Sequence, residues 1–254
     1  MKLLMISHLL GDFYFQTDSM SENKKTSCRP LVLHVIIYTL TVFCMYALAT
    51  GRYQEYTGTV FWLGVFHFVI DYGKIEIEKR CKNQNKYALL LLAVEQIFHL
   101  VILWTFRQIF PFEINFRYLS FFPIYLLGEV GEILTWSIAV LLCGKPAAIF
   151  VGMVFKSIPQ TIQSAEKREN KESNEAGQSE SLKIGSWIGI LEREIILILG
   201  LLEQYGAIGF VLTAKSLARH SQLNNRAFAE KYLVGTLLSA FIALLCVAMC
   251  KWFI

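Results

Sequence analysis

The chain has 254 residues, of which 55% are hydrophobic and 14% aromatic, and only 17% are charged. Soluble globular chains carry about 25% charged residues, so this composition excludes an ordinary soluble domain and indicates a polytopic membrane protein. The formal net charge of +4 does not indicate a nucleic-acid partner, because the basic residues fall between apolar runs and not along one soluble face.

Apolar runs predict an all-α bundle of transmembrane helices, since a helix needs about 20 mostly apolar residues to cross a bilayer. The expected seven to eight segments are 3–17, 31–50, 57–73, 87–106, 122–143, 184–202, 204–219 and 232–252. The first is shorter than a full span. It would be a short helix surrounded by others or a re-entrant helix, which needs protein around it.

Basic residues alternate between the loops. They concentrate in 18–30, 74–86, 144–183 and 220–231 and are sparse in the other loops. Basic loops are retained in the cytoplasm, so this pattern predicts a multi-pass topology with those four loops inside.

One stretch of the chain, residues 160–183, is rich in Glu, Ser, Asn, Lys and Gln and almost free of large apolar residues. Such a composition cannot bury enough surface to fold by itself. We therefore expect an N-terminal helical membrane module (1–156), a flexible cytoplasmic linker (157–183) that could recruit a cytoplasmic protein, and a C-terminal helical membrane module (184–254).

Three pairs of one histidine and one carboxylate, four residues apart, interrupt the apolar stretches. The pairs are His8–Asp12, His67–Asp71 and Glu95–His99. Residues four apart share one face of a helix, and ionisable groups within a membrane are costly and face an interior or a cavity. The loop pattern places the first two pairs, together with His34, in one layer of the cytoplasmic half. The third pair, with Gln96, lies nearer the middle.

Imidazole and carboxylate groups bind zinc and related divalent ions, and catalytic sites keep an open position for water. We expect a divalent metal ion (zinc, manganese or iron), whose bound water would act as a nucleophile at neutral pH. The expected ligands are His8, Asp12, His67, Asp71 and His99. The candidates for catalytic base or orienting group are Asp12, His34, Asp71 and Glu95.

The same pattern fits other functions, because two-residue spacings are weakly specific. The groups could carry protons or a cation in a transporter, with Glu129 and Glu132 extending the path outward. They could also simply pair across helices and fix packing in a non-catalytic scaffold. Lys74, one turn beyond Asp71, suits a lipid phosphate or a pair with Asp71.

Charged residues also occur within apolar runs of the C-terminal module, where they need compensation. Antiparallel neighbours could pair Glu192 or Glu194 with Lys215 or Arg219 as a structural clamp. An anion or headgroup site made by Arg193 with Lys215 and Arg219 is the functional alternative.

The ordered motifs HLLGDFYFQTDSMSENK, LVLHVIIY, HFVIDYGK and EQIFHL resemble the bacterial polytopic membrane proteins grouped as domain of unknown function 3307. The runs IGILERE, GFVLTAKSLARHSQL and AEKYLVGTLLS look like the second half of longer members. The positions that carry the family pattern are His8, Asp12, Gln16, Asp18, His34, His67, Asp71, Gln96 and His99. In that pattern the fourth motif usually reads Asp-Gln, so Glu95 is a longer carboxylate that would shift any ligand geometry.

The resemblance implies a multi-pass protein of the bacterial plasma (inner) membrane and brings no established activity. The polar pairs themselves lead us to expect a membrane-embedded, metal-dependent hydrolase at the cytoplasmic face. The substrate would be lipid-linked or contain phosphate. The sequence leaves the oligomeric state open.

Overall fold

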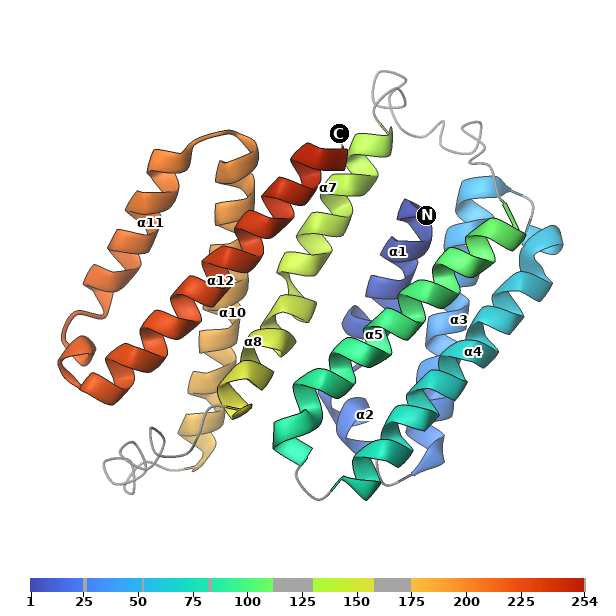
Figure 1. The fold of residues 1–254 in the computed structure, drawn as a ribbon, viewed down its shortest axis with the longest axis horizontal. Coiled ribbons are helices and arrows are strands. Elements are labelled where there is room, and N and C mark those ends of the chain that lie inside the picture. The colour runs from blue at the N-terminus through green and yellow to red at the C-terminus, as the bar shows by residue number, and fades with distance from the viewer. Residues whose placement is uncertain (25–26, 52, 82–83, 112–129, 158–174, 254) are drawn as a thin grey trace. The chain divides into compact units, whose positions relative to one another are not determined.

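The computed structural model describes residues 1–24, 27–51, 53–81, 84–111, 130–157 and 175–253. All regular elements within these ranges are helices (Figure 1). The chain forms two compact units, Met1–Leu141 and Leu142–Ile254. The predicted all-α class is therefore confirmed for the described part of the chain.

The N-terminal unit is a bundle in which α1, α3, α4 and α5 pack on one another. Its elements are α1 (Lys2–Leu9), the π-helical turn η1 (Leu10–Tyr14), α2 (Asp18–Asn23), α3 (Cys28–Thr50), α4 (Tyr53–Arg80), α5 (Gln84–Ile109) and α7 (Val130–Cys143), which ends just past the unit boundary. Glu129, proposed above to extend a proton path, lies outside the described residues.

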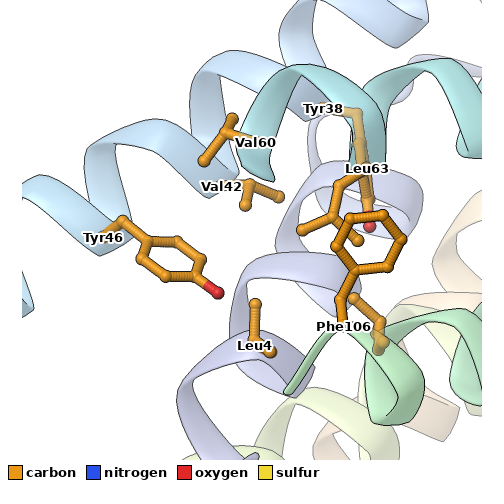
Figure 2. Packing of buried hydrophobic residues seen from close by; sticks show 8 residues of the cluster. Leu4, Tyr38, Val42, Tyr46, Val60, Leu63 and Phe106 are labelled. Atoms are coloured by element: carbon orange, nitrogen blue, oxygen red, sulfur yellow. The ribbon is translucent and has the colours of Figure 1, made fainter. Parts of the chain in front are cut away.

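A tight apolar core holds this bundle together (Figure 2). Its buried members are Leu4, Tyr38, Val42, Tyr46, Val60, Leu63, Leu103 and Phe106. Large apolar side chains such as Ile36, Phe61 and Trp104 point outward and are more than half exposed. Apolar side chains both in the core and on the outer surface fit a bundle surrounded by lipid, where close packing rather than exclusion of water holds helices together.

Glycines permit the closest helix contacts of the N-terminal unit. A Cβ added at Gly11 would lie 2.9 Å from Cδ2 and 3.3 Å from Cα of Tyr38, so only glycine lets η1 approach α3 this closely. Gly64 plays the same part between α4 and Thr39 of α3. These contacts set the separation between the helices that carry the polar pairs.

The C-terminal unit contains a long pair of helices, α10 and α12, that pack along each other. Its elements are α8 (Lys145–Ser157), α10 (Glu175–Leu201), α11 (Tyr205–Ala218), the short 3₁₀ turn η3 (Gln222–Asn224) and α12 (Arg226–Phe253). A Cβ added at Gly200 would lie 2.6 Å from Val247 Cγ2, so this glycine allows close approach of the pair.

The predicted linker falls partly on described residues. Residues 175–183 continue α10 toward its N-terminus, which suits their helix-forming Glu, Ala, Gln, Leu and Lys. Residues 158–174 lie outside the described part of the chain. The three-part domain division stays a prediction.

Within the described ranges, four helical stretches are long and apolar enough to cross a membrane, so the chain is a membrane protein. They are Cys28–Thr50, Tyr87–Ile109, Val130–Ser157 and Phe228–Phe253. Of the other predicted spans, α4 and α10 are long but carry ionisable residues, and α11 is apolar but short. The count of seven to eight segments stays a prediction.

Candidate metal centre

Six buried side chains from five elements of the N-terminal unit meet in one cluster, which we call the His/Asp cluster. They are His8 of α1, Asp12 of η1, His34 of α3, His67 and Asp71 of α4, and His99 of α5. Each is at most 9% exposed. The structure thus brings together residues that span 92 positions of the sequence, from 8 to 99.

The π-helical turn delivers Asp12 to the cluster. The backbone N–H of Phe15 donates to the carbonyl of Leu10, five residues back, at 2.9 Å. Such π-bulges insert an extra residue into a helix and frequently mark functional sites. Gly11, next to Asp12, lets this turn press against Tyr38 of α3. Its sequence signal was limited to that glycine, so the sequence did not predict the π geometry.

One half of the cluster, the first ligand group, comprises Asp12, His34, His67 and Asp71. The two Nε2 atoms of His34 and His67 face each other at 3.0 Å. Asp12 Oδ1 lies 3.3 Å from His34 Nε2 and 3.8 Å from His67 Nε2. The Asp71 oxygens lie 3.5 Å from His34 Nε2 and 3.8 Å from His67 Nε2.

These separations match the coordination shell of a divalent ion. A tetrahedral ion with bonds of about 2.0–2.1 Å holds its ligand atoms about 3.3–3.4 Å apart. The separations from the two histidine nitrogens, to each other and to the carboxylate oxygens, are 3.0–3.8 Å, which brackets that value, and the ligand atoms of the group all lie within 4.8 Å of one another. Two neutral imidazoles can share one proton at this distance, but the two flanking carboxylates make a shared cation the better match.

The other half of the cluster, the second ligand group, comprises His8, Asp12 and His99. His8 Nε2 lies 3.9 Å from Asp12 Oδ2, and the rings of His8 and His99 are 5.1 Å apart. Gln96 bridges His8 and Asp12. Its Nε2 donates to Asp12 Oδ2 at 2.9 Å, and its Oε1 lies 3.1 Å from His8 Nε2.

Several polar atoms of the cluster are buried without a hydrogen-bond partner among the described residues. They are Asp71 Oδ1, both ring nitrogens of His99, and the Nδ1 atoms of His8, His34 and His67. Asp71 Oδ1 and His99 Nε2 lie 3.7 Å apart. Buried polar atoms nearly always have a partner, and exceptions point to a bound water or ion. The donors of the His/Asp cluster therefore fit a divalent cation.

Two lysines lie at the edge of the cluster. Lys24, which follows α2, donates to Asp71 Oδ2 at 2.9 Å and to Gln16 Oε1 at 3.1 Å. Lys74 donates to Glu95 Oε2 at 2.6 Å. The expected alternative of a Lys74–Asp71 pair is wrong, because Lys24 takes that position and the long Lys74 side chain reaches α5.

The remaining candidates from the N-terminal unit lie apart from the ligands. Glu95 is buried but its carboxylate binds Lys74, and it belongs to neither ligand group. Asp18 is exposed in the first turn of α2. Glu132 lies in the first turn of α7, also outside both groups.

Tyr38 is a site residue that the sequence reasoning missed. Its ring stacks on that of His67, with centroids 3.7 Å apart and planes 2° from parallel. Tyr38 follows His34 by four residues on the same face of α3, and that spacing was the available signal. The stack fixes the plane of the His67 imidazole.

The charged residues of the C-terminal unit form two separate arrangements. Lys215 binds Glu192 between α11 and α10, the pairing expected for a clamp, and Arg219 lies 5.9 Å from the centre of the Tyr232 ring. Arg193 is 2% exposed.

The buried Arg193 guanidinium caps the C-terminal end of α7. It donates to the carbonyl oxygens of Cys143 at 2.6 Å and Gly144 at 3.3 Å, and to Ser239 Oγ at 3.0 Å. A cation at a helix C-terminus is favourable. These hydrogen bonds give Arg193 a structural role within the C-terminal unit. They differ from the headgroup site that the sequence suggested for Arg193 with Lys215 and Arg219.

Comparison with known families agrees with the resemblance seen in the sequence. Residues 1–122 match the family model described as "Protein of unknown function (DUF3307)", so this part of the chain is a domain of that family. The match includes the whole His/Asp cluster. No curated protein and no solved structure matches the chain.

Proposed function

We propose that the N-terminal unit is a membrane-embedded, metal-dependent hydrolase. It would act at the cytoplasmic face of the bacterial plasma membrane, in a multi-pass protein, on a lipid-linked substrate that contains phosphate. The observation that carries the proposal is the first ligand group: two buried imidazole nitrogens 3.0 Å apart, flanked by two buried carboxylates at ligand spacing.

The geometry favours a metal site over purely structural pairing. Histidines and aspartates that only fix helix packing would satisfy each other's hydrogen bonds, since an unpaired buried polar atom costs about 1–3 kcal/mol. Here Asp71 Oδ1 and both nitrogens of His99 have no such partner among the described residues. A cation would supply the missing interaction to both side-chain types of the cluster, imidazole and carboxylate.

A divalent ion bound there would activate a water molecule as a nucleophile. The residues of the chain then have three tasks. The buried ligands hold the ion, the Tyr38 stack fixes the plane of His67, and burial of the cluster limits access by bulk water. If Asp71 holds the ion through Oδ2, its Oδ1, which has no hydrogen-bond partner among the described residues, would accept a proton from the activated water.

Two lysines support a phosphate-bearing substrate. Lys24 and Lys74 place their ammonium groups at the edge of the cluster. Lysine binds phosphate oxygens as a point charge. Both lysines are now paired with carboxylates, so a phosphate would have to draw them partly away from Asp71 and Glu95.

An apolar groove supports the lipid part of the substrate. It has a volume of about 590 Å³ and runs along α3 and α4. It begins at Val35 and Phe68, which directly follow His34 and His67 in sequence, and reaches Phe43. An alkyl chain in this groove would leave its phosphate at the depth of the two histidines.

Phosphate release tests the proposal. The full chain in lipid nanodiscs would be supplied with a phosphatidate and with a polyprenyl diphosphate, in the presence of Zn²⁺, Mn²⁺ or a chelator. We expect release of inorganic phosphate that the chelator abolishes and that His34→Ala removes. Arg226→Met, a surface change in the C-terminal unit, should leave it intact.

Metal-independent release, or none from either substrate with any ion, would overturn the hydrolase proposal. Proton or cation flux by the same chain in sealed vesicles would replace it with transport. In that case the flux, and not phosphate release, should depend on the His/Asp cluster.

A further inference from the structure

We infer that the His/Asp cluster binds two divalent ions, with Asp12 as the carboxylate that bridges them. This inference rests on the proposed metal-dependent function and specifies its centre. The reason is that the cluster divides into two ligand groups that share one residue, Asp12. All ligand atoms within each group lie within 4.8 Å of one another.

The two oxygens of Asp12 face different ligands. Oδ1 lies 3.3 Å from His34 Nε2 and 3.8 Å from His67 Nε2. Oδ2 lies 3.9 Å from His8 Nε2 and accepts from Gln96. A carboxylate that presents one oxygen to each of two ligand sets has the arrangement of a bridge between two ions.

Each group has a coordination number suited to a separate ion. The first offers four donors, enough to hold an ion whose shell expands to five-coordinate when it takes up a water molecule. The second offers three, His8, Asp12 and His99, and so leaves a position for water or substrate. Two-metal sites hold their ions about 3.5–4 Å apart. The neighbouring rings of His67 and His99, one from each group, have centroids 4.4 Å apart, which is compatible with that separation.

His99 gives independent support for the second ion. It is 3% exposed, and neither of its ring nitrogens has a hydrogen-bond partner among the described residues. Its Nε2 lies 3.7 Å from the equally unpartnered Oδ1 of Asp71. A buried imidazole without a hydrogen bond is costly, and coordination removes that cost.

Charge balance points to the ligand class. Two divalent ions carry more positive charge than Asp12 and Asp71 neutralise, and Lys24 adds to it, whereas Lys74 is paired with Glu95. A dianionic phosphate group bridging both ions would offset the excess. The two-ion centre therefore fits a phosphate ester or diphosphate better than a neutral ester or amide.

Gln96 determines the order in which the two sites fill. Its amide joins His8 Nε2 and Asp12 Oδ2, the same two atoms that the second ion would join. The Gln96 side chain must therefore rotate away before the second ion binds, whereas in the first ligand group the ring nitrogens of His34 and His67 face each other directly. We expect one tight and one weaker site.

A manganese titration tests the two-ion centre without relying on activity. The full chain, purified in detergent and stripped with a chelator, would be titrated with Mn²⁺ and followed by equilibrium metal content and electron paramagnetic resonance. We expect two ions per chain and, at saturation, the spectrum of an exchange-coupled pair. His99→Ala should retain one ion and lose the coupled spectrum.

Gln96→Ala should have the opposite effect on metal binding from His99→Ala. It should tighten the weaker site by about tenfold, because binding of the ion no longer breaks the Gln96 hydrogen bonds, whose net free energy is of that order. Because it removes no ligand, it tests the second site even if His99→Ala does not fold.

The outcomes separate this inference from the proposed function. Saturation at one ion per chain without coupling would overturn the two-ion centre and leave a one-metal hydrolase. Absence of bound ions would overturn both. Two coupled ions without metal-dependent phosphate release would support the inference and overturn the hydrolase.

Discussion

Replacing Lys24 with methionine should tighten metal binding. Lys24 Nζ lies 2.9 Å from Asp71 Oδ2, and its side chain is 9% exposed. If Asp71 binds a divalent ion at about 2.1 Å, the ammonium lies at most about 5 Å from the ion. Coulomb repulsion at that distance is about 6–7 kcal/mol with an effective dielectric constant of about 20.

Rearrangement of water and of Asp71 offsets part of this repulsion, so we expect a gain of at least about 1.4 kcal/mol, a tenfold lower dissociation constant. The assay is competition with a zinc-binding dye. Lys251→Met is the matched control, because Lys251 pairs with Glu203 in the C-terminal unit and should not change the affinity.

The same substitution distinguishes a metal site from a structural cluster. If Lys24 only neutralises Asp71, Lys24→Met leaves a buried carboxylate uncompensated, which costs about 3–5 kcal/mol. The free energy of unfolding would then fall by that amount, and added zinc would not restore it. Unchanged or weaker zinc binding together with this loss would refute the reasoning.

Three further predictions concern stability and pH. Arg193→Met should lower the free energy of unfolding by about 2–5 kcal/mol, because it removes the buried bonds that cap α7; Arg226→Met, at an exposed pair, should change it by less than about 0.5 kcal/mol, and equal effects would contradict the cap. Gly11→Ala should cost about 1–3 kcal/mol through overpacking against Tyr38, whereas Gly58→Ala, with open space around it, should gain about 0.5–1 kcal/mol; chemical denaturation in detergent measures both pairs, and a stabilising Gly11→Ala would be inconsistent with the close approach. Zinc affinity should fall as the solution is acidified, because imidazoles bind metal only when neutral; dye competition at several pH values measures it, and a flat profile would argue against histidine ligands.

The sequence predicted the layer in which the cluster lies. The alternation of basic loops predicted where each helix enters the membrane, and the four-residue spacing predicted which side chains share a face. These two arguments together predicted His8, Asp12, His34, His67 and Asp71 at one depth. In the structure each of the five lies within 4 Å of at least one of the others. Depth and face are properties of a single helix, which is why the sequence could supply them.

The third pair shows where such reasoning ends. Glu95 and His99 share a face of α5, and both were expected at the inner wall of the cluster. His99 lies 3.7 Å from Asp71, while Glu95 turns to Lys74. Which neighbour a long side chain reaches depends on packing between helices, and helix periodicity does not contain that information.

Lys24 was missed as a site residue for a related reason. The sequence counted it only as a basic loop residue that orients the chain in the membrane. Its contact with Asp71 depends on how α2 folds back after the π-helical turn, with Thr17 Oγ1 accepting from the Met20 backbone N–H at the start of α2. A short helix between two turns gives no periodic signal from which that geometry could be inferred.

The metal content of the purified chain tests the central claim most directly. The full chain would be isolated without chelators or added metal, and zinc, manganese and iron would be measured per chain. The account predicts at least one such ion per chain in the wild type and its loss in a His34→Ala, His67→Ala double variant that still folds. A metal-free wild type, or equal metal content in the two proteins, would contradict it.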